Sequence, residues 1–231
     1  MAKGGSGRRR TAASVDDIPA PPKDLRKSAA TMVWPKGQII HRIHLGLYQG
    51  AQFNPGVKGN ARFSPVKDAK GNSIPTLYGG TTFDCAAMET VFHDVPFVIG
   101  LKTHDRQKLI GQVYSQAAPQ RDLVLADLTS TSLRNLGIRR NQLIDTEKDR
   151  YPQTRAWAAA IHAQRPDIEG LGWVSRQDDR ALALVLFGDR VPATDLMPRG
   201  APIDVLTNLD VYSALLGLAD RIGVKIVHAS A

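Results

Sequence analysis

The chain has 231 residues, a formal net charge of +8 and one cysteine, Cys85. Its hydrophobic content of 42% is enough for a folded core, and the length favours one domain with an added tail. The single cysteine excludes an internal disulfide, and no apolar run approaches the roughly 20 residues of a membrane-spanning helix. The first ten residues carry charges without an apolar stretch behind them, unlike a secretory signal, so we expect a cytoplasmic protein with no membrane partner.

The positive charge is concentrated in the N-terminal stretch, residues 1–36, which holds eight basic and three acidic residues. This stretch is rich in Ala, Pro, Ser and Gly, which is typical of linkers. We therefore predict a disordered basic tail over 1–36 and a folded domain over 37–231. A basic arm can also bind nucleic acid through its phosphates, so a non-enzymatic binding module with such a tail stays an alternative.

The hydrophobic pattern of the first half predicts two strands, a loop and one helix. The strands cover 38–47, which carries Arg42, and 77–78; the loop or hairpin tip covers 66–73; the helix runs through His93, with Thr81, Thr82 or Asp84 as its N-cap. Cys85, Met88 and Phe92 recur at helical spacing and form the apolar stripe of that helix.

The second half predicts more strands than helices. Strands are expected at 108–115, 121–128, 171–175, 181–187 and 224–227, and helices at 132–136 with Ser130 or Ser132 as cap, from Thr154 to Arg165, and at 208–222. Runs of strands without regular βαβ alternation favour an α+β fold.

Three residues between 59 and 94 differ in chemistry from their apolar neighbours. Arg62 precedes a phenylalanine, Tyr78 ends a short apolar run, and Glu89 lies at the edge of the helix stripe. A cleft with a planar cation, an aromatic face and a carboxylate suits a ligand that is part anion and part ring, such as a dinucleotide. Taken singly, each residue also fits a structural role: an ion pair, a core-edge tyrosine and an exposed glutamate.

The order of these residues resembles the RES-domain family, named after an Arg, a Glu and a Ser. Arg62 lies in Asn60-Ala-Arg-Phe-Ser-Pro, and Tyr78 precedes Glu89 by the family's eleven residues. Gly172-Trp-Val-Ser supplies Ser175. Phe63 stands where many members have Trp. The resemblance covers roughly 38–190 and does not include the basic tail.

The resemblance implies an ADP-ribosyltransferase-like fold with a mixed, mainly antiparallel sheet split around an NAD cleft. It implies a toxin that degrades NAD by cleaving the nicotinamide–ribose bond, held inactive by an Xre-type antitoxin that covers the active site. The antitoxin brings the DNA-binding element, so DNA would be met only indirectly. Arg62, Tyr78, Glu89 and Ser175 would be catalytic, and Arg62, Tyr78 and Ser175 would also bind NAD. Arg42 on the first strand is a second candidate phosphate ligand, although a strand Arg packed on the sheet explains it as well.

NAD is expected as substrate, with no cofactor and with inorganic phosphate as a possible co-substrate. The six histidines show no metal-ligand spacing, Cys85 is typical of a small apolar helix residue, and His93 is interpreted as a helix-end histidine. The ribose acceptor can be water, phosphate or a protein side chain. ADP-ribosyltransferases that modify proteins commonly place a polar residue two positions before the catalytic Glu, but here that position is Ala87. This favours a small acceptor and leaves modification of a cellular protein as the alternative.

Overall fold

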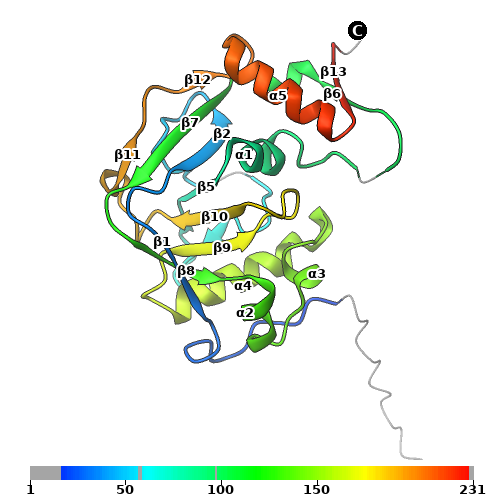
Figure 1. Ribbon diagram of the computed structural model, residues 1–231. Coiled ribbons are helices and arrows are strands. Elements are labelled where there is room, and N and C mark those ends of the chain that lie inside the picture. The colour runs from blue at the N-terminus through cyan, green and yellow to red at the C-terminus, as the bar shows by residue number, and fades with distance from the viewer. Residues whose placement is uncertain (1–16, 57–58, 97, 229–231) are drawn as a thin grey trace, which may run out of the picture.

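The computed structural model describes residues 17–56, 59–96 and 98–228 (Figure 1). These residues form a nine-stranded sheet, two small two-stranded sheets and five α-helices. Along the large sheet the strands follow the order β1 (Thr31–Trp34), β8 (Leu123–Asp127), β9 (Gly170–Val174), β10 (Leu182–Phe187), β5 (Thr76–Gly80), β2 (Ile40–Leu45), β7 (Gln112–Pro119) and β11 (Leu196–Pro198). A short strand β12 (Ile203–Asp204) also pairs with β7.

Within the described part of this sheet, every neighbouring pair is antiparallel except β8 and β9. The prediction of an α+β fold with a mainly antiparallel sheet is therefore confirmed. The helices are α1 (Phe83–Thr90), α2 (Ser130–Asn135), α3 (Arg140–Leu143), α4 (Tyr151–Gln164) and α5 (Leu209–Arg221). The small sheets are the hairpin of β3 (Val66–Lys67) and β4 (Ser73–Ile74) and the parallel pair of β6 (Lys102–Asp105) and β13 (Val224–Val227).

The large sheet divides into two halves between β5 and β2. These strands pair in the described residues at one position, His41 with Gly80, whereas β2 and β7 pair at six. A side chain on Gly79 would come within 2.9 Å of the His41 carbonyl oxygen, so the close crossing of the two strands requires a glycine there. Beyond this crossing β2 leaves β5, and the two halves of the sheet separate.

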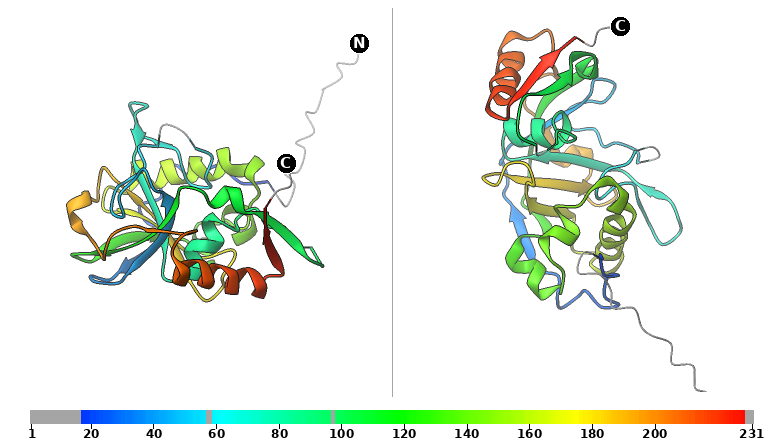
Figure 2. Two further views of the ribbon diagram at one scale, coloured as in Figure 1. Left: turned by 90° about the horizontal axis from the view of Figure 1, so that it is seen from above. Right: turned by 90° about the vertical axis from the view of Figure 1, so that its right-hand side faces the viewer.

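Helices cover the two halves from different sides (Figures 1 and 2). α2, α3 and α4 lie beside the half that contains β8, β9 and β10, and α1 and α5 lie beside β2 and β7. The predicted stripe of Cys85, Met88 and Phe92 is buried, but the helix ends at Thr90 and not at His93, so Phe92 lies just beyond it. The N-cap of α1 is Thr82, which accepts a hydrogen bond from the backbone N–H of Cys85 at 3.0 Å. The predicted helix over 208–222 is α5, capped by Asn208.

The N-terminal stretch departs from the expectation of a disordered tail up to residue 36. β1 pairs with β8 at four positions, and Leu25 and Trp34 are buried. The indole N–H of Trp157 on α4 donates to the Pro19 carbonyl at 2.8 Å. We call residues 17–30 the N-terminal strap. The ordered fold thus starts before residue 37, while residues 1–16 lie outside the described part.

Two further elements begin later or earlier than predicted. The strand expected at 108–115 starts later, at Gln112, and is β7. It starts late because Asp105 caps a 3-10 turn over 106–109 and Gly111 takes a positive φ of 73°. The helix expected to start at Thr154 already starts at Tyr151, and the Thr154 hydroxyl donates to the Arg62 carbonyl, inside the fold, as well as to its own helix.

The remaining differences between the predicted and the observed elements are small. In α2 neither expected serine is the N-cap: the helix follows Thr129, and Ser132 donates to the Asp127 carboxylate at 2.6 Å. The hairpin expected at 66–73 is formed by β3 and β4. The strands β1, β6, β11 and β12 are short and were not predicted. Across the described ranges, no helix combines the length and the apolar character needed to cross a membrane.

Candidate functional site

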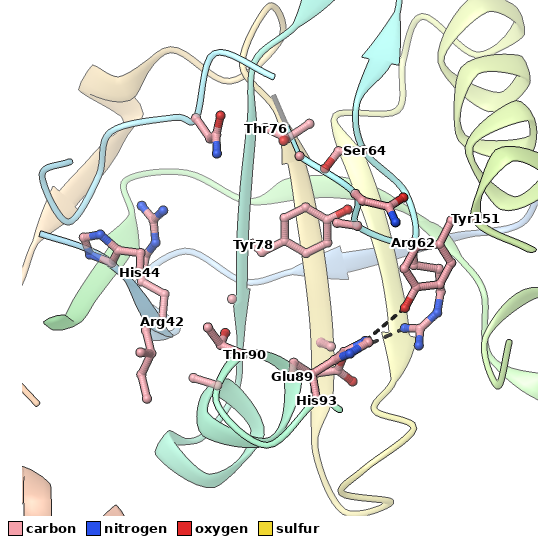
Figure 3. A pocket seen from close by; sticks show the side chains of 18 of the residues that line it. Arg42, His44, Arg62, Ser64, Thr76, Tyr78, Glu89, Thr90, His93 and Tyr151 are labelled. Atoms are coloured by element: carbon pink, nitrogen blue, oxygen red, sulfur yellow. Dashed lines mark hydrogen bonds and ion pairs between the residues drawn. The ribbon is translucent and has the colours of Figure 1, made fainter. Parts of the chain in front are cut away.

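A cavity of about 390 Å³ opens where the two halves of the sheet separate (Figure 3). This volume lies within the range of small-molecule sites, roughly 300–1,000 Å³. Its walls come from β2, β5, the last turn of α1, the loop residues 54–56 and 59–65 and the start of α4. Four of the five predicted site residues, Arg42, Arg62, Tyr78 and Glu89, line it, and Ser175 is not part of the lining.

Glu89 lies in the last turn of α1 and presents each carboxylate oxygen to a different partner. Its Oε1 accepts a hydrogen bond from the Ser175 hydroxyl at 2.7 Å, and its Oε2 lies 3.8 Å from Nη1 of Arg62. The side chain is 15% exposed, so it is partly withdrawn from solvent but still reaches the cavity. The carboxylate is therefore fixed in orientation and ready to face a positive charge that develops on a ligand.

Ser175 is fully buried just after the end of β9, and its hydroxyl can only be the donor in its hydrogen bond with Glu89. The oxygen accepts hydrogen bonds from the backbone N–H groups of Gln177 and Asp178, both at 3.1 Å. The remaining hydroxyl proton therefore goes to Glu89. Arg140 of α3 donates to the carbonyls of Val174 and Ser175, each at 3.1 Å, and holds this strand end in place.

Arg62 is 4% exposed and keeps unused hydrogen-bonding capacity. Among the described residues, its Nε and Nη2 atoms are buried and have no hydrogen-bond partner. The guanidinium carbon lies 5.9 Å from the centre of the Tyr151 ring, and the Arg62 carbonyl accepts from Thr154. Buried donors without partners are uncommon in folded proteins, and a fixed guanidinium of this kind suits a bidentate anion such as a phosphate.

Tyr78 lines the cavity with its ring and holds the loop that carries Arg62 with its hydroxyl. The hydroxyl oxygen accepts a hydrogen bond from the backbone N–H of Phe63 at 3.2 Å. Burial raises the pKa of Tyr78 to about 12, so it is a neutral phenol at physiological pH. Arg62, Tyr78 and Glu89 thus line one cavity, and the fully buried Ser175 contacts Glu89 from outside the lining, while the role of each stays a prediction.

Comparison with known families decides where this arrangement belongs. The model of the RES domain matches residues 39–208, well over half of the chain. The chain belongs to the RES-domain family. No curated protein and no solved structure matches it. All four motif residues lie inside the matched range.

In this RES domain Arg42 lies apart from the other predicted residues. Figure 3 shows it beside His44, across the cavity from Arg62 and Tyr151. Its Nη1 donates to the backbone carbonyls of Gly50 at 2.8 Å and Gln52 at 3.0 Å, so part of the guanidinium is used to hold a loop. Burial lowers the pKa of Arg42 to about 10, which still leaves it positively charged at neutral pH. A contact with a substrate phosphate stays a prediction.

Two residues of the RES domain's cavity were not selected from the sequence, Tyr151 and His93. The Tyr151 hydroxyl lies 3.0 Å from Nε2 of His93, and Nδ1 of His93 lies 2.9 Å from the Asp94 carboxylate, which also pairs with Lys148 at 2.6 Å. Because a carboxylate only accepts, Nδ1 of His93 donates to Asp94, and in the tautomer that carries its proton there Nε2 accepts from the Tyr151 hydroxyl. The interpretation of His93 as a plain helix-end residue missed that α1 ends at Thr90 and that His93 faces the cavity.

The spacing of His93 offered one signal, since it lies four positions after Glu89, about one helical turn. Tyr151 offered none, because its contact with Arg62 forms across 89 residues of chain. Burial raises the pKa of Cys85 to about 12, and the thiol is buried, which agrees with its interpretation as an apolar helix residue. Over the part of the chain that the structure describes, no His, Cys, Asp and Glu residues cluster in a way that could hold a metal ion.

Proposed function

We propose that this RES domain degrades NAD by cleaving the bond between nicotinamide and ribose. The observation that carries the proposal is the paired fixation of Glu89, with the Ser175 hydroxyl at 2.7 Å from one oxygen and Arg62 at 3.8 Å from the other. The carboxylate lines a cavity large enough for a nucleotide. Membership of the RES family supports the link to NAD that the sequence resemblance implied.

The chemistry requires a negative charge beside the ribose. When the C1–N bond breaks, its electron pair goes to the pyridinium ring, so nicotinamide leaves as a neutral molecule. The ribose then passes through an oxocarbenium-like state with positive charge shared by C1 and the ring oxygen. A carboxylate held in place before the reaction stabilises this state, by about 3–4 kcal/mol for one preorganised group. Of the two acidic residues among the described residues of the cavity lining, Glu89 is the one withdrawn from solvent, at 15% exposure against 67% for Asp94, and Ser175 keeps it in one orientation.

Arg62 supplies the complementary charge for the anionic part of the substrate. Its buried Nε and Nη2 atoms, which find no partner within the described ranges, can donate to phosphate oxygens in the fork geometry of a guanidinium. The ring of Tyr78 forms a face against which the nicotinamide or the ribose can pack. The cavity thus offers a site for each part of a nicotinamide nucleotide.

The surroundings of Glu89 support a small acceptor for the ribose. Ala87, two positions before Glu89, is fully buried in the cluster of apolar residues that α1 forms with α5. It neither reaches the cavity nor carries a polar group that could address a protein side chain. Water or inorganic phosphate therefore takes the ribose, and the open donors of Arg62 suit either the phosphate of the substrate or a free phosphate.

The proposed biological role is a cytoplasmic toxin whose cavity an Xre-type antitoxin covers. This part rests on the family resemblance and on the position of the cavity at the protein surface. Expression of the chain alone should lower cellular NAD and arrest growth, and co-expression with the neighbouring reading frame should restore both. Unchanged growth and NAD on expression of the chain alone would contradict the toxin role.

Product analysis tests the reaction directly. The purified protein is incubated with NAD, with and without inorganic phosphate, and the products are identified by mass. ADP-ribose identifies water as the acceptor, and ADP-ribose 1″-phosphate identifies phosphate. Loss of NAD only in the presence of an added protein would instead favour the protein-modifying alternative, and no loss under any condition would refute the proposed cleavage.

A further inference from the structure

A second, smaller cavity of about 220 Å³ adjoins the one that contains Glu89. The two share four lining residues, Arg42, His44, Asn54 and Thr90, and the smaller one adds Leu45, Tyr48 and Gln112. Arg42 and His44 lie across the main cavity from Arg62 and Tyr151 (Figure 3). We call this smaller cavity the distal lobe. A ligand bound at Glu89 could extend into it past the shared residues.

The walls of the distal lobe carry one donor and one acceptor without partners. Arg42 is 5% exposed, and the bonds of its Nη1 to the carbonyls of Gly50 and Gln52 fix the guanidinium. Its Nε is buried and has no partner in the described ranges. The Gln112 side chain donates from Nε2 to the Lys108 carbonyl at 2.7 Å, and its buried Oε1 likewise lacks a partner among those residues.

The orientation of the Gln112 amide follows from this contact. A backbone carbonyl can only accept a hydrogen bond, so the amide nitrogen must face Lys108 and the oxygen must be left over. Buried polar atoms are almost always paired in folded proteins, and an unpaired donor and acceptor beside one cavity point to a ligand that supplies the opposite groups.

The charge of the lobe fits a neutral ring better than a phosphate. Arg42 is its one charged lining residue within the described chain, and Nη1 of its guanidinium already donates to two backbone carbonyls. His44 donates from Nδ1 to the Leu45 carbonyl at 3.0 Å and accepts from the Ser115 hydroxyl at 2.9 Å. Burial and the neighbouring Arg42 lower the pKa of His44 to about 4, so it adds no charge at neutral pH. Tyr48 provides a half-buried aromatic ring.

We propose that the distal lobe binds the adenine ring of the dinucleotide whose nicotinamide end lies at Glu89. This inference rests on the proposed function. Adenine presents an amino donor beside ring-nitrogen acceptors, and a glutamine side chain is a common partner for that edge. The Gln112 oxygen accepts from the amino group, Nε of Arg42 donates to a ring nitrogen, and Tyr48 offers a face for stacking.

The proposal makes a prediction about substrate choice that needs no mutation. Nicotinamide mononucleotide lacks the adenosine half, and nicotinamide hypoxanthine dinucleotide replaces the adenine amino group by a carbonyl oxygen. That oxygen would face the Gln112 oxygen, so two acceptors would oppose each other. The wild-type protein should therefore prefer NAD over both analogues in kcat/KM, by about tenfold or more for the hypoxanthine analogue, as expected for one lost and opposed hydrogen bond.

The variant Gln112→Leu removes the acceptor at similar size. It should raise KM for NAD and bring NAD and the hypoxanthine analogue to similar kcat/KM, while turnover of the mononucleotide changes much less. Gln116→Leu, on the same strand and in the lining of neither cavity, is the matched control and should keep the preference for NAD.

Equal use of NAD and its hypoxanthine analogue by the wild type would overturn the inference. Equal loss of dinucleotide and mononucleotide turnover in Gln112→Leu would overturn it too, because that pattern indicates a structural role. If nothing is cleaved, the proposed function fails separately, and the lobe is then tested by binding. Calorimetry with NAD and the hypoxanthine analogue should still show weaker binding of the analogue, and equal affinities or no binding of either would end the proposal.

Discussion

Two buried arginines stand at opposite ends of the same cavity and are used differently. Arg62 and Arg42 are almost equally withdrawn from solvent, at 4% and 5% exposure. Arg42 gives Nη1 to two backbone carbonyls and so holds the loop that contains Gly50 and Gln52. Arg62 faces a carboxylate at 3.8 Å and an aromatic ring, and two of its nitrogen atoms have no partner among the described residues.

The difference shows which arginine the fold uses and which one it keeps for a ligand. Burying a cation is unfavourable unless hydrogen bonds compensate, and Arg42, whose pKa burial lowers to about 10, obtains part of that compensation from two backbone carbonyls. Arg62 obtains less compensation, because its Nε and Nη2 atoms have no hydrogen-bond partner among the described residues. Such incomplete pairing is typical of functional sites, where stability is given up for binding or catalysis. Substitutions at the two ends should therefore separate activity from stability.

The largest effect is expected from Glu89→Gln, which keeps the shape of the side chain but removes its charge. Turnover of NAD should fall by about a thousandfold, the upper range for loss of one preorganised electrostatic group. Binding of NAD should persist, because the amide still fills the same space. Steady-state assay and calorimetry on the same preparation check both. Asp84→Asn on the same helix, outside the cavity lining, is the matched control and should keep wild-type turnover.

A smaller effect on activity, with an informative effect on stability, is expected from Arg62→Met. The kcat/KM for NAD should fall about a hundredfold, since a bidentate phosphate contact is lost. The free energy of unfolding should stay within about 1 kcal/mol of wild type, because the contact with Glu89 is long, at 3.8 Å, and Glu89 keeps its hydrogen bond from Ser175. Urea titration measures the second quantity.

Arg42→Met is the partner experiment at the other end of the cavity. It leaves the carbonyls of Gly50 and Gln52 without their donor, so the free energy of unfolding should fall by about 1–3 kcal/mol. If both substitutions lower stability equally, the distinction between the two arginines is wrong.

The sequence predicted the part of the site that local chain geometry determines. Tyr78 lies in β5, which ends at Gly80, and Glu89 lies on α1, which starts three residues after Gly80. The interval of eleven residues between them therefore fixes their relative position. The Arg and Ser of the family motif could be placed only through the resemblance, since Ser175 reaches Glu89 from 86 residues away.

Contacts formed by tertiary packing left no comparable trace. The N-terminal strap has linker composition, yet Leu25 is buried and its backbone N–H donates to Gln164 at 2.7 Å. Average composition over a window cannot show that one leucine packs against a distant helix. A truncation that removes residues 1–36 would take β1 and the strap with it. Removal of residues 1–16 alone is therefore the suitable test of whether the basic stretch binds nucleic acid.

A modest effect on turnover is expected from Tyr151→Phe. This change keeps the ring beside Arg62 and removes the hydroxyl that contacts His93 at 3.0 Å. We expect kcat to fall by about threefold to tenfold, the usual worth of one hydrogen bond, with KM nearly unchanged. Tyr151→Leu, which also removes the ring, should lose more and raise KM. If Tyr151→Phe loses as much turnover as Tyr151→Leu, the hydroxyl contributes to turnover and the ring beside Arg62 does not.

The smallest expected effect concerns the pH dependence of stability at the Arg42 end. Burial and the Arg42 charge lower the pKa of His44 from 6.5 to about 4 in the folded state. Between these values the unfolded chain binds more protons than the folded chain, so stability rises with pH across this window. The contribution of His44 to the free energy of unfolding is complete above about pH 6.5 and is lost progressively as the pH falls towards 4.

Because the His44 ring is partly exposed and therefore screened, the contribution should not exceed about 2 kcal/mol. His44→Gln should flatten the slope of unfolding free energy against pH between 4 and 6.5, measured by urea titration at several pH values. Some slope should remain, because burial also lowers the pKa of His41 and His104. His228→Gln, a change at an exposed histidine, is the matched control. An unchanged slope in His44→Gln would mean that the folded protein accommodates a charged imidazole beside Arg42, and the description of that end as neutral apart from its arginine would then be wrong.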